Sequence, residues 1–366
     1  MKKRYLIPVI VLVISAVLTV TARLCRPFAD FYANNIFPVI STPFAWLSGR
    51  VPFSVGEIMI ICGILLVVIG LPLLIVLLIV RKKKRMSTLC GALTVCLWVL
   101  AYIGGTETLN CFMLYGCTRF SERYFPQGEH TRSELVELYG MLIDETNELA
   151  MQVPRDKDDR FELTIDPETE CKKAMHKAAE SYPQLSGYYP PPKPIKFSYF
   201  MSQMDLLGMY IPFSMESNYN NDMVRTNLPD TICHEYAHLK GFIQEDEASF
   251  VAFAATFQSD DPQVRYSGFL DALAYVRNQI VKNDITEAEE YTEKISEQVK
   301  RDWYRFLPDT YWEDNKQKEV FDTETVNTVS EAAADASLKM NGVEDGIESY
   351  SRMVNLLLDY FYPSQK

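Results

Sequence analysis

The sequence of 366 residues predicts an α+β protein that is mainly helical, with a three-helix transmembrane region followed by a larger domain that contains a small sheet. Three observations predict this architecture. Long apolar runs occur before residue 106, apolar residues recur at helical spacing over most of the remainder, and two short stretches are rich in β-branched and aromatic residues. We therefore place a domain boundary between residues 1–105 and 106–366.

The charge of the chain divides at the same place. Residues 1–105 carry 11 basic and 2 acidic side chains, whereas residues 106–366 carry 25 basic and 46 acidic ones. The strongly acidic second part argues against nucleic acid as a partner, because a phosphate backbone is bound by clustered lysine and arginine. It also disfavours adhesion of this domain to anionic lipid.

Three apolar runs are expected to cross a membrane, namely residues 5–22, 56–80 and 87–105. Each reaches the roughly 20 residues that a helix needs to cross about 30 Å of hydrocarbon. None alternates polar and apolar faces as a soluble helix does. The first run also fits a cleavable signal peptide, because basic residues precede it and small residues end it, but its length and Pro8 favour an anchor.

Basic residues flank these spans asymmetrically. Three lie before residue 5 and five lie in residues 81–85, whereas the loop of 32 residues from residue 23 to residue 54 has only three. The positive-inside rule therefore places the N-terminus and residues 81–85 in the cytoplasm. Three crossings then predict a multi-pass protein of the cell membrane whose residues 106–366 are extracytoplasmic.

The second part of the chain is expected to contain several helices and two strands. The predicted helices cover residues 131–153, 167–181, 268–281, 286–306 and 346–361, and the predicted strands cover 195–200 and 209–219. Cys111 and Cys117 lie in this part, where an oxidising exterior would permit a disulfide bond between them. Spacing alone leaves free thiols as the alternative.

A histidine motif indicates metal chemistry. Residues 227–241 read NLPDTICHEYAHLKG, in which His234, Glu235 and His238 form an HExxH pattern. Residues i and i+4 of a helix share one face, so both imidazoles can bind a single metal ion, and Glu235 borders that face. Two imidazoles and a carboxylate favour Zn²⁺, whose bound water a glutamate can deprotonate. We expect His234 and His238 as ligands and Glu235 as the catalytic base.

A third protein ligand is expected in residues 245–255, because a catalytic zinc site keeps one position open for water. The metzincin pattern HExxHxxGxxH requires histidine at position 244, where this chain has glutamine. Glu245 and Glu247 would lie about 200° apart on a helix, so only one can bind the ion. The segment resembles the ExxxD helix of gluzincin metallopeptidases, with Glu245 at the ligand position and Ser249 in place of the aspartate.

We therefore favour Glu245 as the third ligand and keep Glu247 as the alternative. A neighbouring group normally orients a histidine that binds a metal. Without the aspartate of the ExxxD pattern, Ser249, Asp246 or a backbone carbonyl would have to take this role.

Four segments together resemble an uncharacterised family of bacterial, membrane-anchored, zincin-like proteins that bear HExxH. They are PFSVGE (52–57), GMYIPFSMESNYN (208–220), CHEYAHLKGFIQEDEASF (233–250) and LKMNGVEDGIESYSRMVNLLLDYF (338–361). The resemblance covers nearly the whole chain. It implies a zincin-like metallopeptidase domain with a small sheet, tethered to the membrane, and it supplies no substrate.

The sequence gives weaker signals for the residues that would bind the substrate. Residues 209–219 are the expected strand edge beside the metal-binding helix, where an extended peptide would pair. A tyrosine or histidine would stabilise the oxyanion. The residues eligible by type are Tyr210, Tyr219, His176 and Tyr350.

These observations predict a membrane-anchored zinc-dependent metallopeptidase whose partners are the lipid bilayer and a peptide or protein substrate. The alternative is a non-catalytic extracytoplasmic protein that binds peptides or envelope components. Glu235 argues against the alternative, because a structural zinc site has no use for a general base beside two imidazoles. A sensor role is disfavoured because the expected cytoplasmic segments are short.

Overall fold

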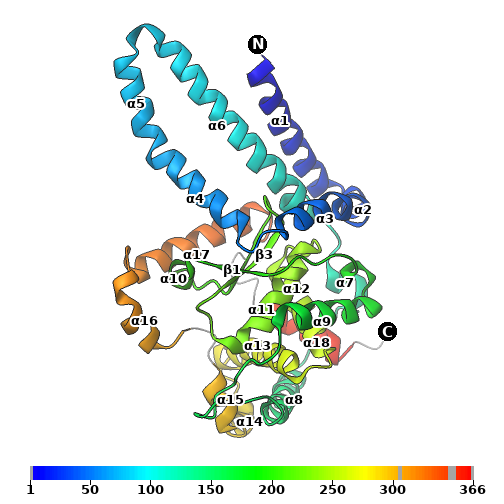
Figure 1. Ribbon diagram of the computed structural model, residues 1–366. Coiled ribbons are helices and arrows are strands. Elements are labelled where there is room, and N and C mark those ends of the chain that lie inside the picture. Colours follow the sequence, from blue (N-terminus) through cyan, green and yellow to red (C-terminus); the bar gives the residue numbers. More distant parts are fainter. Residues whose placement is uncertain (1–2, 304–306, 345–351, 364–366) are drawn as a thin grey trace. The chain divides into compact units, whose positions relative to one another are not determined.

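The computed structural model describes residues 3–303, 307–344 and 352–363 (Figure 1). It is mainly helical with one small sheet, as the sequence predicts. The contacts divide the chain into two units. Unit 1 comprises Met1–Cys117 and Ile211–Glu216, and unit 2 comprises Thr118–Tyr210 and Ser217–Lys366.

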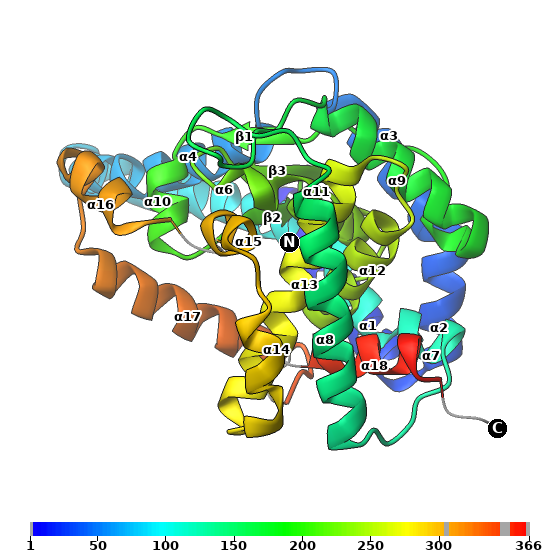
Figure 2. The same cartoon turned by 90° about the horizontal axis from the view of Figure 1, so that it is seen from below.

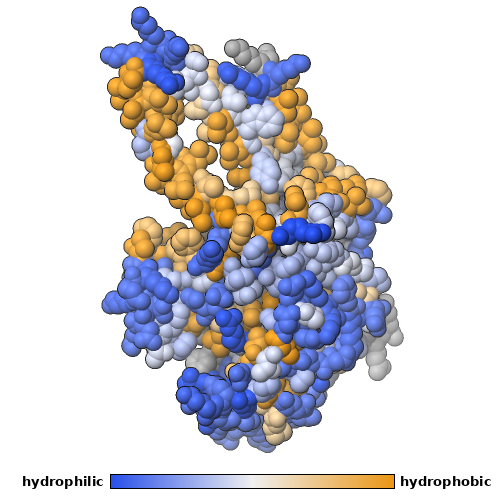
Figure 3. Space-filling model, in the orientation of Figure 1, coloured by the Kyte–Doolittle hydropathy of each residue, from blue (hydrophilic) through white to orange (hydrophobic). Residues whose placement is uncertain are grey.

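Unit 1 contains three helical segments that are long and apolar enough to cross a membrane, and these agree with the three predicted runs. They are Lys3–Leu24, Val55–Val80 and Lys82–Gly116. Their main helices are α1 (Lys3–Leu24), α4 (Val55–Val68), α5 (Gly70–Val80) and α6 (Arg85–Glu107). No residue of α5 is buried, and Figure 3 shows the apolar surface that this helix presents.

The segment between the first two spans is helical rather than an open loop. It contains α2 (Arg26–Phe31), a π-helical turn (Tyr32–Ile36) and α3 (Phe37–Ser48). A proline stands in the first turn of both α2 and α3, where its fixed φ and missing N–H suit a helix start. Cys111 and Cys117 are free thiols, as are the other six cysteines, so the disulfide alternative is not the one observed.

The turn at residues 211–216 belongs to unit 1 although it is distant from the spans in sequence. The Glu216 carboxylate accepts hydrogen bonds from the backbone N–H groups of Val55 and Gly56, at 3.0 and 2.7 Å, where α4 begins. A Cβ atom on Gly56 would lie 2.4 Å from the Ile211 side chain. Two segments on which the family resemblance rests, 52–57 and 208–220, therefore meet here.

Unit 2 is built around helices that pack on one another. The longer ones are α8 (Arg132–Ala150), α9 (Pro167–Ser181), α11 (Leu228–Leu239), α12 (Glu245–Phe257), α13 (Pro262–Lys282) and α17 (Thr323–Met340). The shorter ones are α7 (Phe120–Tyr124), α10 (Ser198–Gln203), α14 (Glu289–Glu293), α15 (Glu297–Asp302), α16 (Asp309–Asn315) and α18 (Met353–Phe361). Helix α8 packs along α13 (Figure 2), and α12 lies between α11 and α13 in the core.

Three of the predicted helices agree with the structure. Helix α8 begins after Thr131, whose side chain forms a capping box with Glu134. Helix α9 has the predicted bounds, and α13 contains the whole of the predicted helix 268–281. The predicted helix 346–361 is observed from Met353 onward, and residues 346–351 lie outside the described part of the chain.

The predicted continuous helix over 286–306 is wrong. A 3₁₀ turn (Thr286–Ala288), α14 and α15 replace it, and residues 304–306 are not described. The break falls at Ser296, whose hydroxyl accepts a hydrogen bond from the Val299 N–H and so caps a new helix. Serine competes with the helical backbone in this way, which favours a cap over a helix interior.

The sheet has three strands, β1 (Lys193–Ile195), β2 (Gly208–Ile211) and β3 (Glu216–Asn220), in the order β1–β3–β2. Strand β1 runs parallel to β3, with Ile195 opposite Asn220. Strand β2 therefore lies at an edge of the sheet and has β3 on one side only, within the described residues.

Both predicted strands need correction. The prediction of a strand at 195–200 is wrong beyond Ile195, because residues 198–203 form α10, where the ring of Tyr199 packs against Trp312. The predicted strand 209–219 is a hairpin, because residues 212–215 turn between β2 and β3. Met215 adopts a positive φ of 54° there and donates its N–H to the Ile211 carbonyl.

Candidate metal site

The HExxH segment forms helix α11, and a sharp turn leads from it to α12. Pro229 and Asp230 lie in the first turn of α11, where proline and an acidic residue are favoured. Gly241 follows the helix with a φ of 95°, a conformation that suits glycine. This short turn returns the chain so that Glu245, at the start of α12, faces α11.

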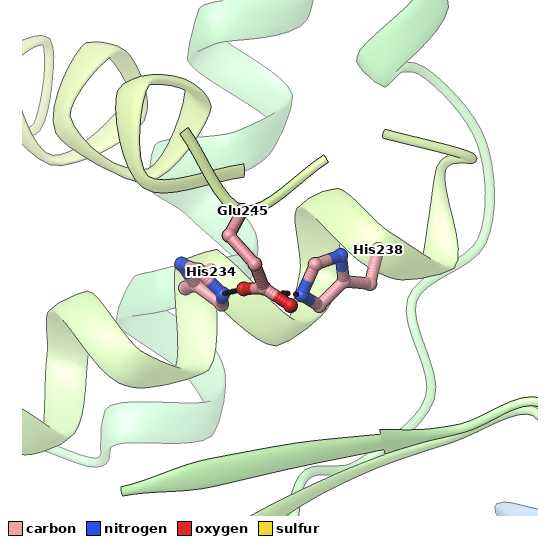
Figure 4. A group of neighbouring side chains, drawn as sticks. All are labelled: His234, His238 and Glu245. Atoms are coloured by element: carbon pink, nitrogen blue, oxygen red, sulfur yellow. Dashed lines mark hydrogen bonds and ion pairs between the residues drawn. The ribbon is translucent and has the colours of Figure 1, made fainter. Parts of the chain in front are cut away.

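Two histidines and a glutamate meet between these helices (Figure 4). His234, His238 and Glu245 each offer one ligand atom, and the three atoms lie within 4.8 Å of one another. The Glu245 Oε2 atom is 3.1 Å from His234 Nε2 and 3.5 Å from His238 Nε2. Ligands placed about 2 Å from a tetrahedral zinc ion lie roughly 3.3 Å apart, so the two distances from the carboxylate to the imidazoles suit such an ion, and the donor set is one that Zn²⁺ accepts.

The charges of the cluster's members affect one another's protonation. Burial alone would lower the pKa of His238, but the adjacent Glu245 carboxylate outweighs it and raises that pKa to about 9. Burial raises the pKa of Glu245, but the two imidazoles outweigh it and hold that pKa well below its usual range. The Glu245 carboxyl group is therefore ionised at neutral pH, as a ligand for a cation must be.

Glu235 lies beside the cluster and is almost fully enclosed, with 4% of its surface exposed. Its Oε2 atom has no hydrogen-bond partner, and burial raises its pKa to about 7. The backbone of Tyr210, in β2, also forms a hydrogen bond with the carboxyl group, which lowers the pKa slightly against the effect of burial. A carboxyl that titrates near neutrality suits a general base.

Gly208 allows β2 to lie directly against Glu235. A Cβ atom at position 208 would be 2.2 Å from Glu235 Oε1 and 2.8 Å from its Cγ. Because those atoms belong to a buried side chain, any larger residue would displace either the strand or the carboxyl group. Gly208 carries no signal of this role in the sequence, although it is the first residue of the GMYI segment.

The two histidines are oriented by different groups. His238 Nδ1 is 2.8 Å from the backbone oxygen of Phe242, whereas His234 Nδ1 is 3.3 Å from the hydroxyl of Ser249. Ser249 Oγ is also 3.3 Å from the hydroxyl of Tyr275. A serine and a backbone carbonyl, both considered from the sequence, thus contact the imidazoles. Tyr275 was not anticipated, because nothing in its local sequence connects it with α11.

The remaining acidic candidates on α12 face other partners. Glu247, the alternative third ligand, is fully buried and accepts hydrogen bonds from the Ser121 N–H at 2.9 Å and the Ser121 hydroxyl at 2.6 Å. Asp246 pairs with Arg352 at 2.7 Å and with Arg119 at 3.4 Å. Within the described residues, the structure therefore brings Glu245 to the two imidazoles and directs its neighbours elsewhere.

The candidates for oxyanion stabilisation are dispersed. The Tyr210 ring lies 5.9 Å from the His238 ring, centroid to centroid, and Tyr219 lies on β3. His176 instead packs edge-on against Tyr189, with centroids 5.3 Å apart. Tyr350 lies outside the described residues. Tyr210 is thus the candidate that the described structure places beside a histidine of the cluster.

The fold and the cluster define a mainly helical protein with three helices that could cross a membrane and a His–His–Glu group that could hold a metal ion. Residues 32–358 match the family described as "Protein of unknown function (DUF3810)", and the chain belongs to this family. No curated protein and no solved structure matches the chain.

Proposed function

We propose that this protein is a membrane-anchored zinc-dependent metallopeptidase that hydrolyses peptide bonds. The observation that supports this proposal is the meeting of His234, His238 and Glu245 beside the buried carboxyl group of Glu235. Three potential ligands and a separate acid–base group are the minimum that metal-assisted hydrolysis requires from a protein.

His234, His238 and Glu245 would hold the zinc ion. Zinc, when bound, supplies a Lewis acid that polarises a carbonyl group and acidifies water. The three ligands leave one position open, which distinguishes this donor set from the closed four-ligand sets of structural zinc sites.

Glu235 would take a proton from the attacking water and later deliver it to the leaving amine. Its burial supports this role, because a carboxyl group whose pKa is about 7 accepts and releases protons near neutral pH. Its Oε2 atom, which has no hydrogen-bond partner, is available for this exchange.

Strand β2 would align the substrate. It is an edge strand whose residues Gly208 and Tyr210 lie against Glu235, so an extended peptide that pairs with its open side would pass close to the base. The excess of acidic residues after position 105 favours basic or neutral peptides as substrates.

We further propose that residues 106–366 are extracytoplasmic and that the chain crosses the membrane three times. The basic residues before position 5 and at positions 81–85 support this orientation. A reporter enzyme that is active only outside the cytoplasm, fused after residue 105, is expected to be active. A fusion at residue 83 is the matched control and should be inactive, and the reverse pattern would contradict the topology.

The central test compares the full-length protein with Glu235→Gln after purification in detergent. We expect stoichiometric zinc in both proteins and cleavage of a peptide library by the native protein alone. Zinc in both proteins without cleavage by either would contradict the peptidase and favour the binding protein considered above. A folded native protein without zinc would contradict the metal site itself.

A further inference from the structure

One face of α12 holds both nitrogens of the His234 ring. Glu245 and Ser249 are four residues apart on α12 and therefore share a face. Glu245 Oε2 lies 3.1 Å from His234 Nε2, and Ser249 Oγ lies 3.3 Å from His234 Nδ1. The imidazole, which comes from α11, is thus held at its two opposite nitrogens by consecutive turns of one helix.

Ser249 is itself held in place by α13. Its side chain is buried, with 4% of the residue exposed, and its hydroxyl lies 3.3 Å from that of Tyr275, which is also buried. Buried hydroxyl groups are expected to satisfy their hydrogen bonds within the protein, so the positions of Ser249 and Tyr275 depend on each other.

When His234 binds a metal through Nε2, its hydrogen bond with Ser249 runs in one direction. A neutral imidazole that offers Nε2 to an ion carries its proton on Nδ1. The Nδ1–H group then donates to Ser249 Oγ, and either hydroxyl of the Ser249–Tyr275 pair can donate to the other. Ser249 therefore accepts the proton of the metal-binding tautomer and holds the ring with Nε2 toward Glu245.

His238 differs, because its Nδ1 faces the backbone oxygen of Phe242 at 2.8 Å. A carbonyl oxygen can only accept, so it fixes the proton on Nδ1 without help from any side chain. Of the two histidines, His234 is the one whose orientation rests on a side-chain hydroxyl.

We propose that Ser249, held by Tyr275, is a positioning residue that accepts the Nδ1 proton of metal-bound His234 and directs Nε2 toward the metal. This inference rests on the proposed function, since it concerns the same metal site. A hydroxyl is neutral, so it attracts the Nδ1 proton less strongly than a carboxylate would. The metal is accordingly held less tightly than in a site whose histidine is oriented by a carboxylate.

The test measures the zinc dissociation constant of the full-length protein in detergent by competition with a chelating dye. We expect Ser249→Ala to weaken zinc binding by about 10- to 100-fold, the usual effect of losing an outer partner of a ligand. Tyr275→Phe should weaken it less, because Ser249 still contacts His234. Ser249→Thr keeps the hydroxyl and should restore binding.

Two variants serve as matched controls. Ser267→Ala removes a buried hydroxyl that accepts a hydrogen bond from the Asp230 N–H at 3.0 Å, and Tyr266→Phe removes a hydroxyl that donates to Asp302 at 2.8 Å. Both lie on α13, and neither hydroxyl contacts the two histidines, so both variants should retain the native zinc constant.

The zinc dissociation constants of these variants test the positioning role of Ser249. Zinc bound equally well by the native protein and Ser249→Ala would overturn the positioning role and leave the proposed function standing. Weakening by Ser267→Ala and Tyr266→Phe to the same extent would show a general loss of stability and would also overturn it. A native protein that binds no zinc would overturn the proposed function, and the positioning role with it.

Discussion

Helices α5 and α12 are opposites in what they bury. Helix α5 consists entirely of apolar residues, glycine and proline, and none of its residues is buried. Helix α12 buries 11 of its 13 residues, and these include Asp246 and Glu247. Exposed apolar side chains are stable in lipid, whereas buried carboxylates require partners within the protein. The apolar surface of α5 is therefore suited to lipid, and the partners of the buried carboxylates around α12 show how each one is accommodated.

The partners of the buried carboxylates separate structural groups from candidate catalytic ones. Glu247 is bound by Ser121, and Asp246 by two arginines. Glu235, on the neighbouring α11, and Asp246 each have one oxygen without a hydrogen-bond partner. Within the described residues, however, Asp246 is paired with arginines, whereas Glu235 lies beside the two histidines of the cluster. A buried carboxyl group without a lysine or arginine partner costs stability, so its retention favours a functional explanation.

The largest expected effect is the loss of zinc when one of its proposed ligands is removed. His238→Ala removes one of three ligands, and we expect the purified protein to contain no zinc by atomic absorption. His176→Ala is the matched control, because His176 packs against Tyr189 and not against the cluster, and it should retain zinc. Equal zinc in the two variants would contradict the ligand assignment.

A charged residue on α5 tests whether the exposed surface of this helix faces lipid. We expect Leu73→Asp to make membrane insertion of this span less favourable by about 3 kcal/mol. Leu73 is 53% exposed and lies within the span, whereas Leu73→Ile keeps the apolar surface and should insert normally. Insertion is measured by glycosylation mapping in microsomes, and failure of the native span to insert would contradict a membrane span.

The pH dependence of stability tests whether the Glu235 carboxyl group is buried without a cationic partner. Burial raises its pKa from 4.5 to about 7, so the folded protein favours the protonated form. The contribution of this group to stability is then full below pH 4.5 and is lost as the pH rises to about 7, by roughly 3 kcal/mol. Thermal unfolding of zinc-free protein should show this loss in the native chain and not in Glu235→Gln. Parallel pH profiles for the two proteins would refute it.

The smallest expected effect concerns a carboxylate with purely structural partners. Ser121→Ala removes the hydroxyl that donates to Glu247 and leaves one backbone N–H to the carboxylate. We expect a loss of about 1–3 kcal/mol in the free energy of unfolding, measured by chemical denaturation, with unchanged zinc content. A loss of zinc in this variant would contradict Glu245 as the third ligand and favour Glu247.

Much of the helical fold could be predicted from the sequence, because its signals are local. The apolar runs, the capping box of Thr131 and Glu134, and the i, i+4 spacing of His234 and His238 each lie within one helix. Such patterns follow from backbone geometry and do not need knowledge of distant contacts.

The features that escaped prediction depend on contacts between distant residues. Glu216 binds the start of α4 across about 160 positions of sequence, and Tyr275 reaches Ser249 from another helix. Residues 198–203 have strand-like composition, but packing makes them a helix. Gly208 is informative only when Glu235 is seen beside it. Tertiary contacts of this kind leave no periodic signal in a single sequence.

The unequal support of the two histidines has an evolutionary consequence. The group that orients His238 is the Phe242 carbonyl, and every amino acid supplies a carbonyl, so substitution at position 242 leaves that acceptor in the chain. The group that orients His234 is a side chain, so a change of one codon at position 249 can replace it. If the cluster binds zinc as proposed, natural variation in its affinity is therefore expected to concentrate at residue 249 and its partner, residue 275.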